Sequence, residues 1–346
     1  MEPPPRAPAE PTITERIAAR ATRIHVNTGA VCNNNCLFCM EEDREARERE
    51  NSRVTLDVVR ALLDEQGAEE VCFTSGEPTT NPRLPDFAVA ARARGYRRIS
   101  VMTNGRMLSR APYTQRLLAA GVNRFYVSIH GHEATLHDGL TRTPGSFAQT
   151  VRGLDVVKAL GRAARGPVEL HTSTVVTRRN LPHMGAIYRF LRARGVDQVV
   201  FNVMQPNGRA HTAFDQLFPK YSEIADSFKS FISSAEETAR GERVMAFLVD
   251  IPLCATEGVP DFNRGFVEAH AHTGSLEEAA RLFGDVVPAN RLTAGGRFVI
   301  IERADLDAAR RRWRDECGAC RHRPSCEGVW GNYLARHGWG EFVPVT

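Results

Sequence analysis

Three cysteines lie within eight residues near the start of the chain, in the segment VCNNNCLFCM. Cys32, Cys36 and Cys39 are separated by three and then two residues, so one loop presents three thiols to one metal centre. Three thiolates hold three irons of a cubane iron–sulfur cluster and leave the fourth iron open, whereas a cluster with four thiolates is closed and transfers electrons. An open iron binds a substrate, so this spacing predicts a cluster that carries out chemistry.

Zinc offers an alternative interpretation of the same loop, as do three unrelated thiols. A structural zinc site needs four ligands that lie close together. No further cysteine or histidine lies between Cys39 and the next predicted helix, which begins at residue 56. The missing fourth ligand favours the iron–sulfur cluster.

A second group of cysteines lies near the end of the chain, at Cys317, Cys320 and Cys326. Their spacing of two and then five residues is typical of metal ligands. Cys254 is distant in sequence and supplies a fourth thiolate if the fold brings it to this group. Four thiolates suit zinc or an iron–sulfur cluster, so both metals remain open. Cys72 lies in an apolar segment and is predicted to be a buried, inert thiol.

The composition is that of an ordinary folded protein. The 346 residues are enough for one large α/β domain and a smaller one, and 42% of them are apolar. The 45 Lys and Arg against 41 Asp and Glu give a formal charge of +4, too weak to indicate a nucleic acid or a membrane as partner. Residues 1–12 lack the apolar core of a signal peptide. We therefore expect a cytoplasmic protein, in a reducing compartment where cysteines bind metals.

Short apolar strands alternate with amphipathic helices as far as residue 204. Strands are predicted at 23–27, 70–74, 98–102, 124–129, 168–176 and 198–204, and helices at 56–66, 84–94, 113–120, 147–160 and 184–194. Such alternation implies right-handed crossovers and a parallel sheet. Polar residues fall where strands end, at the face that carries the active site of β/α barrels: Asn27, Thr74, Asn104, Ser128 and Asn202. We expect an open, partial (β/α)6 barrel of the TIM-like kind.

The pattern changes after residue 205. We expect a long amphipathic helix at 218–240, strands at 244–251 and 297–302, and a polar helix at 304–314, while 255–290 is ambiguous. The densely charged segment 43–53 is predicted to be a solvated loop or helix. The predicted organisation is a disordered tail (1–22), a partial barrel (23–215), and a linker helix with a small α+β metal-binding domain (216–346).

Together, these features resemble the radical S-adenosylmethionine (SAM) superfamily over roughly residues 23–210. The first cysteine group, with Phe38 before its last cysteine, matches the signature of that superfamily. Three later segments are also similar to family motifs and follow in the same order: Ser75-Gly76-Glu77-Pro78, Thr103-Asn104-Gly105 and Tyr126-Val127-Ser128-Ile129.

The resemblance implies roles for individual residues. The turn Ser75-Gly76-Glu77-Pro78 would receive the amino group of SAM, with Glu77 accepting from the ammonium and Ser75 standing where the family usually has glycine. Asn104 belongs to the second motif, Ser128 would lie near the SAM ribose, and Arg142 would meet the SAM carboxylate. His130 stands where many relatives have an acid, so it either faces the substrate or is a structural histidine.

The resemblance also implies the reaction. The open iron of a 4Fe–4S cluster on Cys32, Cys36 and Cys39 would chelate SAM. A low-potential electron from a flavodoxin or ferredoxin would then break the carbon–sulfur bond of SAM. The resulting 5′-deoxyadenosyl radical would take a hydrogen atom from the substrate.

The second cysteine group resembles the SPASM/twitch extension that follows the barrel in many radical SAM enzymes. With only Cys254, Cys317, Cys320 and Cys326 available, this implies one auxiliary 4Fe–4S cluster, as in a twitch domain. Zinc remains the alternative metal. If Cys254 is not a ligand, it would return a hydrogen atom to a substrate radical, as in some radical epimerases.

We therefore expect a radical SAM oxidoreductase or maturase that acts on a peptide. Dehydrogenation or epimerisation of a small metabolite is the second possibility. A non-catalytic protein that binds zinc or an iron–sulfur cluster is the hypothesis from a different class.

Overall fold

The computed structural model describes residues 23–29, 31–40, 54–65, 70–164, 166–206, 208–238, 245–259, 262–263, 291–294, 297–302, 311–323, 326 and 328–346. The predicted tail at 1–22, the charged segment 43–53 and most of 260–290 lie outside these residues.

A parallel sheet of seven strands, hydrogen-bonded in chain order, organises the molecule. The strands are β1 (Arg23–Asn27), β2 (Glu70–Thr74), β3 (Arg98–Thr103), β4 (Arg124–Ser128), β5 (Glu169–Val176), β6 (Gln198–Val203) and β7 (Met245–Val249). β-Branched and aromatic residues such as Val71, Phe73 and Phe125 are fully buried in them, as expected of strands covered on both faces. The predicted α/β class and parallel sheet are confirmed.

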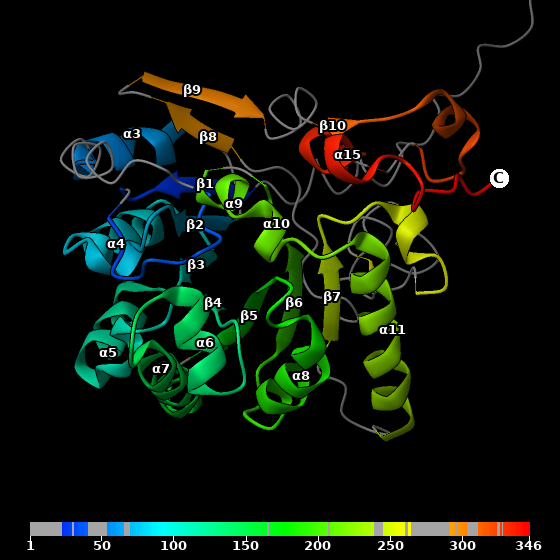
Figure 1. Cartoon of the computed structure of the whole chain (residues 1–346). Coiled ribbons are helices and arrows are strands. Elements are labelled where there is room, and N and C mark those ends of the chain that lie inside the picture. Colours follow the sequence, from blue (N-terminus) through cyan, green and yellow to red (C-terminus); the bar gives the residue numbers. More distant parts are fainter. Residues whose placement is uncertain are drawn as a thin grey trace, which may run out of the picture.

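Helices connect successive strands along the outer side of this sheet (Figure 1). They are α3 (Leu56–Glu65), α4 (Leu84–Ala93), α5 (Ala111–Ala120), α6 (Ala134–Thr141), α7 (Ser146–Arg162), α8 (Met184–Arg192) and α11 (Tyr221–Thr238). Short turns of helix lie at η1 (Pro78–Thr80), η2 (Met107–Ser109), η3 (Leu181–His183), α9 (Arg209–Thr212) and α10 (Phe214–Leu217). The sequence did not predict α6, α9 or α10.

The barrel has a seventh strand, which differs from the six expected from the sequence. The strand predicted at 244–251 pairs with β6 in parallel, with Met245 opposite Gln198, so it belongs to the barrel and not to a second domain. Helix α11 is its crossover, because Phe231 of α11 packs on Tyr188 of α8 and on Phe201 of β6. Burial of these rings holds α11 in the same layer as the earlier helices.

The C-terminal segment packs beside the barrel. It contains the hairpin β8 (Arg291–Ala294) and β9 (Arg297–Glu302), near β1 in Figure 1, and the short pair β10 (Arg311–Arg312) and β11 (Val329–Trp330), with η6 (Asp315–Ala319) and α15 (Gly331–His337). The predicted polar helix 304–314 is wrong at its end, where β10 forms; residues 303–310 lie outside the described part. No helix of the described residues is long and apolar enough to cross a lipid bilayer.

Aromatic contacts and an ion pair hold this segment to the barrel. Tyr333 of α15 packs on Phe218 and Tyr221, with ring centroids 5.4 and 4.6 Å apart. Arg311 of β10 is buried and forms an ion pair of 3.0 Å with Asp250, which directly follows β7. The carboxylate of Asp250 offsets the cost of removing water from Arg311. This buried ion pair favours an extended chain at residue 311 over an exposed polar helix.

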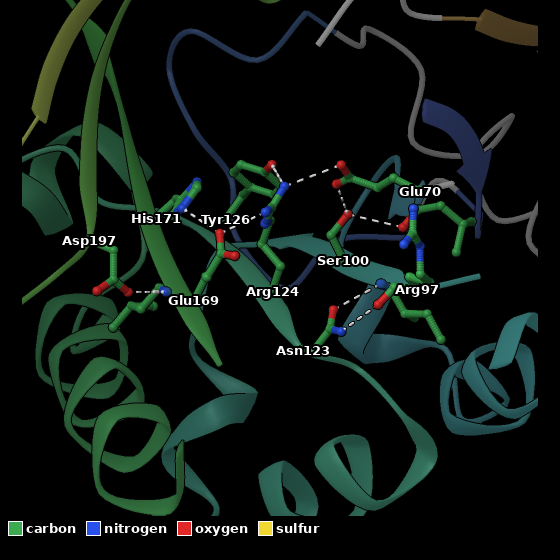
Figure 2. Close-up of polar contacts among 12 residues, drawn as sticks. Glu70, Arg97, Ser100, Asn123, Arg124, Tyr126, Glu169, His171 and Asp197 are labelled. Atoms are coloured by element: carbon green, nitrogen blue, oxygen red, sulfur yellow. Dashed lines mark hydrogen bonds and ion pairs between the residues drawn. The ribbon is translucent and has the colours of Figure 1, made fainter. Parts of the chain in front are cut away.

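A charged network forms the floor of the barrel, at the amino-terminal ends of the strands (Figure 2). Arg124, only 2% exposed, lies between Glu70 at 3.2 Å and Glu169 at 2.7 Å. Ser100 donates to Glu70 at 3.0 Å, and His171 lies 3.2 Å from Glu169. The strand register brings Ser100, Arg124 and Glu169 side by side. Burial lowers the pKa of His171, so this ring is neutral at neutral pH.

Replacement of Arg124 by Leu tests the floor. We expect a loss of about 3–5 kcal/mol in the free energy of unfolding, because Glu70 would keep a buried charge without its cation. Denaturant titration measures this loss. Adding Glu70→Gln to Arg124→Leu should recover part of the loss. The exposed control Arg116→Leu should stay within about 0.5 kcal/mol of the unchanged chain. An equally small effect of Arg124→Leu would contradict this account.

The pKa of Glu169 predicts an acid-dependent loss of stability. Burial raises this pKa, but bonds from His171 and Arg124 outweigh burial and lower it to about 2, from the ordinary value of 4.5 in the unfolded chain. The stabilisation is therefore complete above about pH 4.5 and is lost as the pH falls toward 2.

We expect Glu169→Gln to cost about 1 kcal/mol at pH 6, since water screens a side chain that is 39% exposed. The melting temperatures of the unchanged chain and the variant should converge near pH 2. The highly exposed Asp57→Asn serves as a control without such convergence. A gap that stays constant between pH 6 and pH 2 would refute the assignment.

Candidate active site

The first cysteine group lies in a loop, residues 31–40, that follows β1 and has no regular secondary structure. Its backbone is bonded to distant parts of the barrel. The amide of Asn35 donates to Thr141 at 3.0 Å, and that of Leu37 donates to Leu140 at 2.9 Å, both at the end of α6. The carbonyl of Val31 accepts from the amide of Glu77 at 2.8 Å. These bonds fix the loop at the carboxyl edge of the sheet.

The three thiols of this loop share one location and are half-buried. The pKa of the Cys36 thiol is raised to about 12, first by burial and then by the neighbouring Cys32 and Cys39 sulfurs. Across the described residues, no three His, Cys, Asp or Glu side chains converge on a point that would hold a single ion. A cubane does not need that convergence, because each thiolate binds a different iron, and three thiols in one loop fit it.

Asn104 and Arg106 hold the first half of the loop. The Asn104 side-chain amide donates to Asn33 Oδ1 at 2.6 Å and lies 4.0 Å from the Cys32 sulfur. Arg106 donates to the Asn33 carbonyl and, at 3.0 Å, to the Asn34 side chain. The backbone amide of Asn34 also donates to the Cys32 sulfur at 3.4 Å. Polar contacts of this kind orient metal ligands and tune the charge on sulfur.

Arg209 of α9 holds the second half of the loop. Its guanidinium donates to the Asn35 carbonyl at 3.1 Å, to Asn35 Oδ1 at 2.7 Å and to the Cys36 carbonyl at 2.7 Å. The next residue, Ala210, donates its amide to the Cys39 carbonyl at 3.2 Å. Helix α9 and the chain just before it are tied to the C-terminal segment. Asn332 of α15 donates to the Pro206 carbonyl at 2.7 Å and lies 3.2 Å from His211 Nδ1 of α9.

The turn after β2 contains the predicted residues Ser75, Gly76, Glu77 and Pro78. Ser75 and Gly76 both have positive φ angles, 73° and 53°, which for serine is a strained conformation. Glu77 is only 2% exposed, and burial raises the pKa of its carboxyl group. Its carboxylate accepts from Thr79 Oγ1 at 2.5 Å, from Thr103 Oγ1 at 2.6 Å and from the Asn104 amide at 2.6 Å.

These contacts give Glu77 a structural role that the sequence did not predict. Its carboxylate joins the turn after β2 to the turn after β3, and therefore to the side chain that contacts Cys32. Protein donors already occupy much of the Glu77 carboxylate, because three of its hydrogen bonds come from Thr79, Thr103 and Asn104. The expected contact between Glu77 and an ammonium group remains a prediction.

A close contact between two glycines supports the turn after β3. Gly105 has a φ angle of 77°, and a Cβ atom there would lie 2.7 Å from Val127. A Cβ atom on Gly153 of α7 would collide with the Gly105 carbonyl oxygen. Only glycine at both positions lets α7 approach the turn that carries Asn104 and Arg106.

The histidines beside the loop make structural contacts. The ring of Phe38 packs edge-on against His130 at 4.6 Å. His130 Nδ1 accepts from the Val175 amide at 3.2 Å, and His137 Nδ1 accepts from the His130 amide at 3.1 Å. Burial lowers the pKa of both rings, that of His137 to about 4, so both are neutral. Of the two roles left open for His130, these bonds favour the structural one.

The remaining predicted residues of this site lie at the same edge of the sheet. Ser128 ends β4, is half-buried and lies opposite Ser173 in the strand register. Arg142 follows α6, is exposed and has a positive φ angle of 51°. It directly follows Thr141, which binds the cysteine loop, so Arg142 lies beside that loop.

The structure brings all four cysteines of the second group together. Burial and the neighbouring sulfurs of Cys326, Cys320 and Cys317 raise the pKa of Cys254 to about 12. The Cys320 sulfur accepts from the Val345 amide at 3.3 Å. Cys254 lies in η4 (Leu253–Thr256), which directly follows β7. The seventh strand therefore delivers Cys254 to a group that is distant in sequence.

Sequence reasoning missed Arg106 and Arg209. Arg106 stands two residues after Asn104, so its place next to a predicted motif was a usable signal. Arg209 is separated from Asn35 by 174 residues and lies in a four-residue helix that carries no motif. Nothing in the sequence indicated that contact.

Comparison with known proteins identifies the fold. The profile of the Radical SAM superfamily matches residues 26–191. Residues 26–191 form a radical SAM domain. This match begins at the end of β1, includes the first cysteine group and runs into α8, and it confirms the family that the sequence motifs indicated.

Curated relatives of the radical SAM domain differ in their named reactions. The chain is 29% identical over 205 residues to an AdoMet-dependent heme synthase of Nitratidesulfovibrio vulgaris, which covers 58% of this chain and 53% of that protein. It is 30% identical over 196 residues to a probable GTP 3′,8-cyclase of Metallosphaera sedula, with 55% and 58% covered. The chain therefore spans about half the length of the curated relatives that it matches.

Solved structures share the fold over more of the chain. SuiB of Streptococcus suis, bound to S-adenosylmethionine, has a TM-score of 0.56 at 12% identity and covers 94% of this chain and 77% of its own. Native anSMEcpe, with bound AdoMet and the Cp18Cys peptide, has a TM-score of 0.55 at 14% identity and covers 93% and 96%. At these identities the likeness shows the fold alone.

Replacement of Arg209 by Ala tests its role as a positioning residue. We expect the rate of SAM cleavage to fall about 10- to 100-fold, as is typical when a group that orients metal ligands is removed. Production of 5′-deoxyadenosine by anaerobically reconstituted protein measures the rate, and the iron content reports the cluster. Arg336→Ala is a matched control, because Arg336 pairs with the exposed Asp215 nearby. Equal rates for the two variants would contradict the role.

Proposed function

We propose that this chain is a radical SAM enzyme that reductively cleaves SAM to a 5′-deoxyadenosyl radical and abstracts hydrogen from a peptide. The observation that carries the proposal is the shared location of Cys32, Cys36 and Cys39 in a loop at the carboxyl edge of the sheet. A 4Fe–4S cluster bound there would supply the electron that breaks the carbon–sulfur bond of SAM.

The chain's own residues would bind and orient SAM around this cluster. The strained turn at Ser75 and Gly76 would approach the SAM amino group, because its backbone has little side-chain cover. Arg142, exposed beside the loop, would pair with the SAM carboxylate. Ser128, at the end of β4, would donate to the ribose. Asn104 would keep the Cys32 sulfur oriented.

The inner face of the barrel favours a peptide over a phosphorylated metabolite. Above the floor, its residues include these neutral polar or apolar side chains: Asn27, Thr74, Met102, Tyr126, Ser128, Ser173 and Asn202. The seven strands, as described, present no lysine or arginine on this face above Arg124. Amides and hydroxyls pair well with peptide groups, whereas phosphates favour arginine or lysine. Solved neighbours with bound peptides agree with this choice.

A small metabolite is the second candidate, since the names of the curated relatives specify heme synthesis and cyclisation of GTP. Dehydrogenation or epimerisation would use the same radical. The grouping of Cys254 with three other thiols argues against a free thiol that donates hydrogen, and supports Cys254 as a fourth ligand.

We further propose that Cys254, Cys317, Cys320 and Cys326 hold an auxiliary 4Fe–4S cluster. Four thiolates would close this cluster and suit it to electron transfer, so it would accept the electron of a substrate radical. Zinc on the same four sulfurs is the alternative.

Cysteine variants test the two sites separately. Anaerobically reconstituted protein should carry about eight irons and make 5′-deoxyadenosine from SAM and dithionite. The triple change of Cys32, Cys36 and Cys39 to Ala should remove about half of the iron and all SAM cleavage. Cys72→Ala, which alters the buried thiol in β2, is the matched control and should keep both.

The variant Cys254→Ser tests the second site. Loss of about half of the iron with SAM cleavage retained would support a ligand of an auxiliary cluster. Full iron with loss of turnover of a substrate peptide would instead make Cys254 a hydrogen donor. Colourless protein that contains zinc and releases no 5′-deoxyadenosine would refute the proposed function as a whole.

A further inference from the structure

A hollow lies on the surface between the start of α5 and the middle of α7. Its volume is about 490 Å³, and its lining residues are Ser109, Arg110, Ala111, Pro112, Gln149 and Arg152. Arg110 and Arg152 are exposed there. Gln149 and Arg152 are three residues apart on α7, so both lie on one side of that helix.

The lining of this hollow is positively charged. Its charged residues are Arg110 and Arg152, and no aspartate or glutamate is among the lining residues. Where the structure places side chains, no carboxylate pairs with Arg110 or Arg152. The whole chain has a formal charge of only +4, so the basic character is local.

One side chain connects the hollow to the loop of the first cysteine group. Arg106 donates to Gln149, in the wall of the hollow, at 2.7 Å. The same guanidinium donates to the carbonyl of Asn33, the residue after Cys32. The hollow is therefore separated from the cysteine loop by a single layer of bonded side chains, on the outer side of the barrel and away from its polar inner face.

We propose that this hollow docks the protein that delivers the electron, a small one-electron carrier with an acidic face. This inference rests on the proposed function. One electron leaves the reduced carrier and is consumed when SAM is cleaved to methionine and the 5′-deoxyadenosyl radical, so the carrier is oxidised by one electron each time. Arg110 and Arg152 attract its carboxylates, which steers encounter and fixes orientation. Because Arg106 links the wall of the hollow to the cysteine loop, a carrier docked in the hollow lies next to that loop.

The test compares two reductants on the same reconstituted protein. Reduced flavodoxin is an acidic carrier that must dock, whereas dithionite is a small reductant that reaches the site directly. We expect the double change Arg110→Glu and Arg152→Glu to slow flavodoxin-driven SAM cleavage roughly tenfold or more at low ionic strength. The dithionite-driven rate should stay the same. Salt should slow the unchanged chain more than the variant, since screening acts on the arginines.

Two further variants make the result specific. Arg162→Glu reverses an exposed charge at the far end of the same helix, ten residues from Arg152, and should leave both rates unchanged. The double change of Arg110 and Arg152 to Lys keeps the charge and should keep most of the flavodoxin-driven rate.

An unchanged flavodoxin-driven rate in the charge-reversed variant would overturn the proposal. An equal loss with both reductants would also overturn it, because the arginines would then act on the cluster and not on docking. Failure of the unchanged chain to cleave SAM with dithionite would instead refute the proposed function.

Discussion

The cysteine loop depends on hydrogen bonds from other parts of the chain. Because residues 31–40 form no helix or strand, their backbone groups need partners elsewhere. The end of α6, the turn after β2, the turn after β3 and α9 each supply some of these partners. The shape of the loop therefore depends on all four elements. The sheet as a whole holds the cysteine loop in place, which is not a local motif.

Charged and neutral polar side chains occupy opposite ends of the barrel. Paired charges around Arg124 fill the floor, where buried ions are stabilised by their partners. Neutral groups such as Ser128, Ser173 and Asn202 occupy the opposite end. Ions near a reacting radical would hold water, whereas neutral hydrogen-bonding groups orient a substrate without doing so. Residues two apart on a strand point to the same side, so each strand places its inward residues in order along the barrel axis. The strand register then aligns charged residues at one end and neutral residues at the other.

The sequence was sufficient for the features that are local. Each strand from β1 to β6 was predicted because an apolar run ends at a polar residue, and the cysteine spacing indicated a metal centre within one loop. The seventh strand was assigned to the wrong domain, because its partner β6 is joined to it through a long helix whose docking depends on rings such as Phe231. Helix α6, only eight residues long, was missed because it contains few apolar residues.

The functional site was predictable to the same extent. The cysteines were found from spacing, and Cys254 was assigned to the second group by counting thiols, but only the fold brings its sulfur near the other three. The buried partners of Glu77 come from two other turns, and burial of a carboxylate is not visible in a sequence. Arg209 was unpredictable because its contact with Asn35 crosses the open edge of the barrel.

The contact between Gly153 and Gly105 makes a helix residue outside the cysteine loop part of the structural support of the site. Gly153 has no side chain, lies in the interior of a helix and touches neither cysteine group, yet the turn that carries Asn104 and Arg106 rests on it. Sequence change at this helix position is therefore restricted by the same geometry that restricts the thiols. In a set of homologous sequences, we therefore expect glycine at this position to be retained together with the cysteines.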